Sequence, residues 1–460
     1  MEVYCNSTAQ SEITEMTSKL KQFAALVELY RDDMTDKDMF MSELSYFESV
    51  DWTKENYFNQ LLAYTALGSA YGFLKSKNLD YTLAYYDNEY VYKEISYYHN
   101  VHYIVSRVSN EQWAALYISA TKTSCRAFLC LANAYDHLGR FCEAQQFYRL
   151  ANLDDANQKD VEINQGYFYA NMHSFYTEEE PWIVRKAQAL LKKYPQEYDR
   201  TTPGLRRIVC SWKAPSFDVP QEDFFGMNEG AYEFWVNKNY LRFNRFNDVD
   251  PFSKLSIADN VKLQHINDTE ENMQFYESSF GEIKRTFIET RKLLYTSIGG
   301  DGVVNIELLK MTYKNFYSIL DKIALFLKAY LDLPIEVYRV DFSTMWTDKR
   351  NNIRPEILAH PQNLSLLALY NIKLDVYGSK SFNYVMDEQT KNLQRIRNFI
   401  EHKVIVIKDG PMCYDDYQLT ISKEELGLDT IRLAQLVRCA IIYLCNFVMH
   451  AEYDKTEGRK

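Results

Sequence analysis

The sequence predicts an all-α protein. It contains only 15 glycines and 10 prolines among 460 residues, a combined share of about 5% where average proteins have about 12%, so few positions call for turns or left-handed backbone. Long stretches also repeat apolar residues every three or four positions, as amphipathic helices do. An apolar fraction of 47% provides material for a large core and excludes global disorder. We therefore expect helices throughout, arranged in about two to four structural units.

Charge and cysteine content exclude several classes of protein. The net charge of -11 gives no overall attraction for nucleic acid, so any contact with RNA requires a local basic patch. Eight cysteines are too few for a disulfide scaffold, and none form a C-x-x-C pair. No segment has the ~20 apolar residues of a membrane span or the features of a secretion signal. The sequence predicts a cytoplasmic protein with no membrane association, metal site or cofactor.

Residues 1–200 are predicted to form paired helices. The segment Phe128–Ala151 fits the helix-turn-helix pattern of the tetratricopeptide repeat. Gly139 stands where the turn between the two helices requires left-handed backbone. Ala132 and Ala144 are small enough to let two helices approach closely. The segment therefore predicts one helical hairpin of this type.

Two weaker copies extend the pattern into a tetratricopeptide-like α-solenoid. One begins at Tyr64, with its second helix within Tyr81–Tyr98, and the other runs from Ile163 to Tyr176 and from Trp182 to Tyr194, after Pro181 at a helix start. Stacked hairpins of this kind leave a concave surface that commonly holds a protein or peptide. The alternative is a set of packed hairpins without a ligand. Many of the 37 tyrosines fall here among acidic residues, which favours packing over a base-stacking platform.

The remaining chain is predicted to divide into a connecting module and a helical bundle. In residues 201–265 the helical periodicity fades and prolines interrupt the chain. Residues 266–460 return to long amphipathic helices, which predict a bundle. The expected long helices are Thr269–Ser297, Asn305–Leu331, Asn383–His402 and Asp429–Glu452, with short helices over Phe342–Ala368.

The candidate site lies in the third of these long helices, where four residues separate Arg397 from His402. At ~100° per residue, these two side chains point about 140° apart. Arg397 and Glu401 are neighbours on one face, as are Asn398 and His402. One interpretation is purely structural: a surface ion pair between Arg397 and Glu401, and a helix-terminal His402 stabilised by the helix dipole.

Four collinear blocks favour a different interpretation. They are Leu131–Ala151, Trp235–Asp248, Ser278–Tyr295, and Tyr317–Tyr330 followed by Arg397-Asn-x-x-x-His402. Together they resemble a subfamily of HEPN (higher eukaryotes and prokaryotes nucleotide-binding) ribonucleases that joins N-terminal tetratricopeptide repeats to a C-terminal bundle. The Arg-x4-6-His signature of HEPN ribonucleases matches Arg397 and His402.

The resemblance implies a metal-independent endoribonuclease that leaves 2′,3′-cyclic phosphate and 5′-hydroxyl ends. His402 is then the general acid or base and Arg397 binds the phosphate oxygens, while Asn398 and Glu401 support them. In HEPN dimers two copies of the motif face one another, which implies a homodimer here and accommodates the 140° separation. The basic residues expected to bind RNA are Lys391, Arg395, Lys403 and Lys408.

In biological terms the resemblance implies a bacterial stress or antiphage defence effector with a sensor or docking arm. One position departs from the family: HEPN toxins paired with nucleotidyltransferase antitoxins have Tyr two residues after the His, where this chain has Val404. The alternative function is a non-catalytic scaffold that binds protein through the repeats and dimerises through the bundle.

Overall fold

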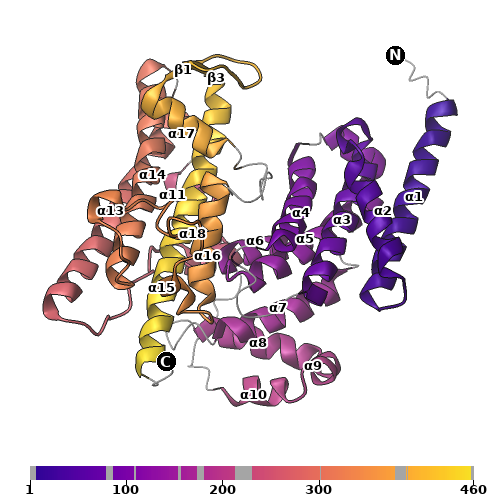
Figure 1. Ribbon diagram of the computed structural model, residues 1–460, viewed down its shortest axis with the longest axis horizontal. Coiled ribbons are helices and arrows are strands. Elements are labelled where there is room, and N and C mark those ends of the chain that lie inside the picture. The colour runs from indigo at the N-terminus through magenta and orange to yellow at the C-terminus, as the bar shows by residue number, and fades with distance from the viewer. Residues whose placement is uncertain are drawn as a thin grey trace. The chain divides into compact units, whose positions relative to one another are not determined.

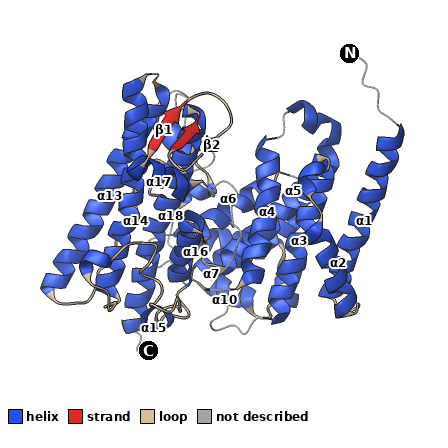
Figure 2. Ribbon diagram, turned by 45° about the horizontal axis from the view of Figure 1, so that its top comes forward, coloured by secondary structure: helices blue, strands red, loops and turns tan. Residues whose placement is uncertain are grey.

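The computed structural model describes residues 7–78, 86, 88–107, 110–153, 157–173, 181–212, 231–300, 302–378, 390 and 392–456. Figure 2 shows helices throughout these residues, apart from one small sheet. The all-α prediction is confirmed, and the sheet is an addition that the sequence analysis did not anticipate. The chain divides into two compact units, built mainly from Met1–Tyr135 with Phe147–Asn164, and from Asp136–Gln146 with Gln165–Val385 and Gln389–Lys460.

Helix pairs form the first unit. Its main helices are α1 (Ser7–Arg31), α2 (Lys37–Ser49), α3 (Tyr57–Asn78), α4 (Glu89–Arg107) and most of α5 (Asn110–His137). Helix α3 packs against α1 and α4. A Cβ atom at Gly68 would lie 2.6 Å from the Tyr98 ring, so glycine there lets α3 and α4 approach closely. A buried ion pair, Lys75 with Glu94, links the same two helices.

The predicted hairpin around Gly139 has the expected local geometry. Helix α5 ends at His137, α6 spans Phe141–Ala151, and Gly139 between them has a φ of +70°. Within the first unit, the Tyr148 hydroxyl donates to Asn133 Oδ1 at 2.6 Å. Gly139 itself belongs to the second unit, where an added Cβ would lie 2.3 Å from the Leu364 carbonyl oxygen. The solenoid as a whole, and the domain boundaries near residues 200 and 265, stay predictions.

The second unit contains several short helices and a long bundle. The elements before the bundle are α7 (Gln158–His173), which begins in the first unit, α8 (Pro181–Lys193), α9 (Pro195–Thr201), α10 (Leu205–Ser211), α11 (Tyr232–Lys238) and α12 (Phe246–Val249). The bundle comprises α13 (Glu270–Gly299), α14 (Val303–Tyr330), α15 (Pro355–Leu358), α16 (Leu364–Tyr377), α17 (Leu393–His402) and α18 (Lys423–Thr456). Figure 1 shows α13, α14 and α18 lying side by side, in agreement with their contacts.

Buried charges attach the connecting segment to the long helix α18. Arg438, which is fully buried, donates twice to the Asp248 carboxylate at 2.7 Å. Its other N–H groups donate to the carbonyls of Arg242 at 2.8 Å and Asn244 at 2.6 Å. The guanidinium therefore satisfies both the carboxylate and the backbone of this segment, as burial of a charge requires.

A second group of buried polar side chains attaches the start of α6 to the bundle. Arg140, which directly precedes α6, pairs with Glu143 in the first turn of that helix and with Asp375 on α16. The Tyr443 hydroxyl of α18 donates to Glu143 and accepts the backbone N–H of Cys142 at 3.0 Å. These bonds make the start of α6 part of the bundle core.

Helix α18 is long and apolar enough to cross a membrane by length and composition alone. However, 83% of its most apolar 18-residue window is buried inside the protein. A core helix of a soluble protein has the same character, because all of its faces pack against protein. The burial of α18 is consistent with a soluble protein.

Candidate functional site

Helix α17 is held in the bundle by one apolar face. Leu393, Ile396 and Phe399 are buried at three-residue spacing, which directs the polar residues between them outward. The Tyr313 hydroxyl of α14 donates to the Leu393 carbonyl at 2.7 Å and fixes the start of the helix. Helices α14 and α16 both contact α17.

Arg397 lies half-buried against α14. Its guanidinium carbon is 5.5 Å from the centroid of the Tyr317 ring, within the range of a cation–π interaction. Burial raises the pKa of Asp321, and the positive charge of Arg397 opposes that rise. Among the described residues the guanidinium makes no hydrogen bond or ion pair, so its five N–H donors are available to a ligand.

His402 is exposed and is the last residue of α17. Neither Arg397 nor Asn398 bonds to it within the described part of the chain. Glu401 pairs with Lys314 of α14 at 3.3 Å, so it does not hold Arg397 as the sequence analysis allowed. The surface ion pair of the purely structural interpretation is thus not formed. Within one chain, no hydrogen bond of the described residues joins Arg397 to His402.

An open pocket of about 560 Å³ lies beside the motif. It is lined by Gln394, Arg395, Asn398, Phe399, Lys403, Tyr414, Asp415 and Asp416. Of the predicted site residues, the structure brings Arg395, Asn398 and Lys403 together here. Arg397, Glu401 and His402 lie outside the lining, and Lys408 is exposed just after the first strand of the sheet. Lys391 lies outside the described residues.

The pocket wall opposite α17 comes from the small sheet. Strand β1 (Val404–Ile407) pairs in parallel with β3 (Gln418–Ile421), and β2 (Cys413–Tyr414) pairs antiparallel with β3. Figure 2 shows the sheet next to α17. Tyr414, Asp415 and Asp416 were not predicted as site residues. The signal was available, because the β-branched run Val404–Ile407 and the later turn residues are typical of strands.

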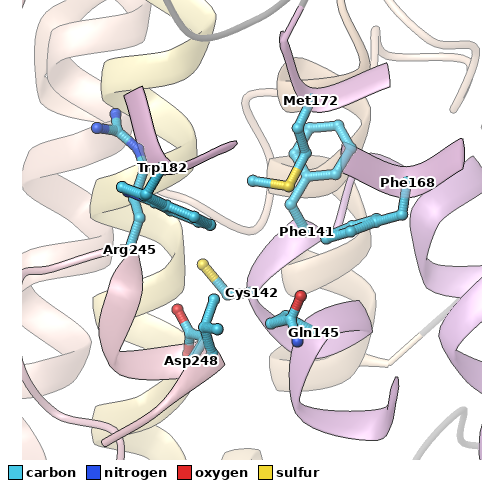
Figure 3. A pocket seen from close by; sticks show the side chains of 9 residues that line it. Phe141, Cys142, Gln145, Phe168, Met172, Trp182, Arg245 and Asp248 are labelled. Atoms are coloured by element: carbon cyan, nitrogen blue, oxygen red, sulfur yellow. The ribbon is translucent and has the colours of Figure 1, made fainter. Parts of the chain in front are cut away.

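A second cavity lies deeper in the same unit but is too small for a ligand. Figure 3 shows Cys142, Trp182, Arg245 and Asp248 around it. Its volume is about 10 Å³, close to the minimum for one water molecule. The ring of Trp182, which lines the cavity, packs edge to face on the Phe246 ring, with centroids 5.1 Å apart. The site is therefore a packed junction between α6, α8 and the connecting segment.

A comparison with protein families assigns the bundle. Residues 267–452 match the family described as LA2681-like HEPN. They form a HEPN-family domain. The match runs from just before α13 almost to the end of α18 and includes Arg397, Asn398 and His402 of α17. No curated protein and no solved structure matches the chain.

In the described ranges, no three His, Cys, Asp or Glu side chains gather closely enough to hold a metal ion. The groups of the HEPN domain that can act chemically are the exposed imidazole of His402, the guanidinium of Arg397 and the polar residues that line the pocket beside them.

Proposed function

We propose that the HEPN domain is a metal-independent endoribonuclease. The observation that carries the proposal is the position of His402 in a HEPN-family domain: exposed at the end of α17, one residue before Lys403 of the open pocket. Imidazole is the side-chain group most often used for general acid–base catalysis. It can take the proton of a ribose 2′-hydroxyl, whose oxygen then attacks the adjacent phosphorus.

Arg397 supplies the second group that this reaction requires. Negative charge builds on the non-bridging phosphate oxygens as the 2′-oxygen attacks, and a guanidinium stabilises it through two parallel N–H bonds. The guanidinium carbon of Arg397 lies 5.5 Å from the centroid of the Tyr317 ring, and no described residue accepts from its N–H groups. The imidazolium formed at His402 gives its proton to the departing 5′-oxygen, and the products are a 2′,3′-cyclic phosphate and a 5′-hydroxyl.

The proposal includes a homodimer, because Arg397 and His402 of one chain point in different directions. Two copies of α17 across a two-fold axis bring Arg397 of one chain toward His402 of the other. Exposed apolar side chains near the motif support self-association. Met311, which is 55% exposed, lies one turn before the Lys314 that pairs with Glu401. Val404 of β1 donates its backbone N–H to the carbonyl of Tyr417, in the turn before β3. Their side chains are 55% and 81% exposed, respectively.

The family resemblance supports a biological role for this nuclease. The protein acts in the cytoplasm as a bacterial stress or antiphage effector, and its tetratricopeptide-like arm binds a protein or peptide that controls the nuclease. The buried bonds of Arg140 and Glu143 support such control, because they join the start of the second helix of the predicted hairpin to the bundle.

The test uses the purified full-length protein and single-stranded RNA in the presence of EDTA. We expect His402→Ala to lower the cleavage rate by about 10²- to 10⁴-fold, the usual contribution of general acid–base catalysis. His265→Ala, which removes another exposed histidine of the same unit, is the matched control and should cleave at the wild-type rate. Equal rates for both variants would favour the scaffold function instead.

A further inference from the structure

The open pocket beside α17 has a charge pattern that a phosphate site does not need. Two of its lining residues are cations, Arg395 and Lys403, and two are carboxylates, Asp415 and Asp416. Carboxylates repel phosphate oxygens and weaken a site for phosphate alone. They are, however, the natural acceptors for N–H groups on the edge of a nucleobase. The mixture indicates a site where cations hold the backbone and carboxylates read a base.

Tyr414 provides a fixed aromatic surface in this pocket. The guanidinium carbon of Arg395 lies 4.1 Å from the centroid of the Tyr414 ring. Arg395 is itself held by Asn392, whose Oδ1 accepts from Nη1 at 2.7 Å. Tyr414 nevertheless remains 54% exposed. Unpaired RNA bases stack on aromatic side chains that are fixed and accessible in this way.

The two carboxylates next to Tyr414 have unused acceptor atoms. Asp415 Oδ1 accepts the backbone N–H groups of Tyr417 and Gln418, both at 2.8 Å. These bonds, together with the charge of Lys403, hold the pKa of Asp415 below its ordinary value, so the group is ionised at neutral pH. Within the described chain, Asp415 Oδ2 and both oxygens of Asp416 have no hydrogen-bond partner.

Guanine is the base that matches such acceptors best. Its N1–H and N2–H groups lie side by side and bond to the two oxygens of one carboxylate. Adenine and cytosine present one amino group beside a ring acceptor, and uracil presents N3–H between two carbonyl oxygens that a carboxylate repels. We propose that the pocket formed by α17 and the β2–β3 turn binds a guanine of single-stranded RNA, stacked on Tyr414 and bonded to Asp416. The inference rests on the proposed RNA cleavage for its choice of ligand class.

The experiment measures binding separately from cleavage. Full-length protein carrying His402→Ala is titrated into four fluorescent uridine hexamers that hold G, A, C or U at one central position. A well-placed bidentate contact discriminates between bases by about 5- to 150-fold, so we expect that preference for G over U. Asp416→Asn, added to His402→Ala, replaces one acceptor by a donor and should reduce the affinity for G to that for U.

Asp409→Asn is the matched control, because Asp409 is exposed in the turn after β1 and does not line the pocket. It removes the same charge and should keep the preference for G. Tyr414→Ala should weaken binding of all four RNAs. Equal affinity of the His402→Ala protein for the four RNAs would overturn the guanine site. The same preference for G in the Asp416→Asn and Asp409→Asn variants would also overturn it.

The two proposals fail in different ways. Cleavage that requires His402 but shows no preference for guanine overturns the guanine site and leaves the nuclease. A preference for guanine in binding, without cleavage by the wild type, overturns the nuclease and supports the pocket as a guanine site.

Discussion

The replacement Arg438→Met tests whether the connecting segment is an integral part of the HEPN-bearing unit. Methionine keeps much of the side-chain volume but removes the charge and every hydrogen bond of the guanidinium. Asp248, only 1% exposed, is then left without its cation, and the carbonyls of Arg242 and Asn244 lose a donor. Removing one partner of a buried ion pair typically costs about 3–5 kcal/mol, and we expect a loss of unfolding free energy in that range.

The assay is urea unfolding of the full-length protein, followed by circular dichroism at pH 7. The matched control is Arg285→Met on α13, where the arginine is 72% exposed and pairs with Glu282 at 3.2 Å. Exposed pairs contribute about 0–1 kcal/mol, so this variant should stay close to the wild type. A loss in Arg438→Met no larger than the loss in Arg285→Met would refute the reasoning.

The same variant has a predicted dependence on pH. Burial already raises the pKa of Asp248 above its ordinary value, against the lowering effect of Arg438. Without Arg438 the pKa of the folded state rises further above that of the unfolded state. A raised carboxyl pKa means that stability is greatest at low pH and falls as the pH rises through the folded value. Arg438→Met should therefore differ less from the wild type at pH 5 than at pH 8.

Two further replacements test local features of the fold by the same urea assay. Gly139→Ala should lower the unfolding free energy by more than the ~1 kcal/mol usual for alanine at positive φ, because its Cβ would also meet backbone at 2.3 Å. The control is Gly204→Ala, where φ is +84° and nothing lies within 4 Å of the added atom. Equal losses of unfolding free energy in the two variants would contradict the close contact. Burial raises the pKa of Asp136 to about 7, well above the ~3.9 of an unfolded aspartate. Wild-type stability should therefore fall as the pH rises from about 4 to about 7, by about 1.4 kcal/mol per pH unit, and level off above pH 7, where both states are ionised. Asp136→Asn should flatten this dependence, and an unchanged slope would argue against a neutral Asp136 in the folded protein.

The long amphipathic helices were predictable because apolar residues recur every three or four positions along each of them. The prediction Thr269–Ser297 differs from α13 by one or two residues at each end, and Thr269 caps that helix by accepting the backbone N–H of Asn272. Helix α16 was not predicted as one helix, since eleven of its 14 residues are buried and it shows no polar face. Sequence periodicity cannot identify a helix that packs on every side.

The candidate site was predictable only in part. The motif residues Arg397 and His402 lie on a helix as expected, and three of the predicted polar residues line one pocket. The lining residues Tyr414, Asp415 and Asp416 were missed because the strands of the small sheet are short. Strand pairing also brings together residues whose spacing in the sequence shows no helical periodicity. The ion pair between Asp248 and Arg438 was also missed, because the two residues are 190 positions apart and charged side chains are usually exposed.

The ends of the RNA fragments test the central claim most directly. Wild-type protein incubated with a defined single-stranded RNA in EDTA should leave 2′,3′-cyclic phosphate and 5′-hydroxyl ends, identified by mass spectrometry, and His402→Ala should leave the RNA intact. Fragments with 3′-hydroxyl and 5′-phosphate ends, or the same fragments from His402→Ala, would contradict a HEPN site that cleaves RNA through its own histidine and arginine.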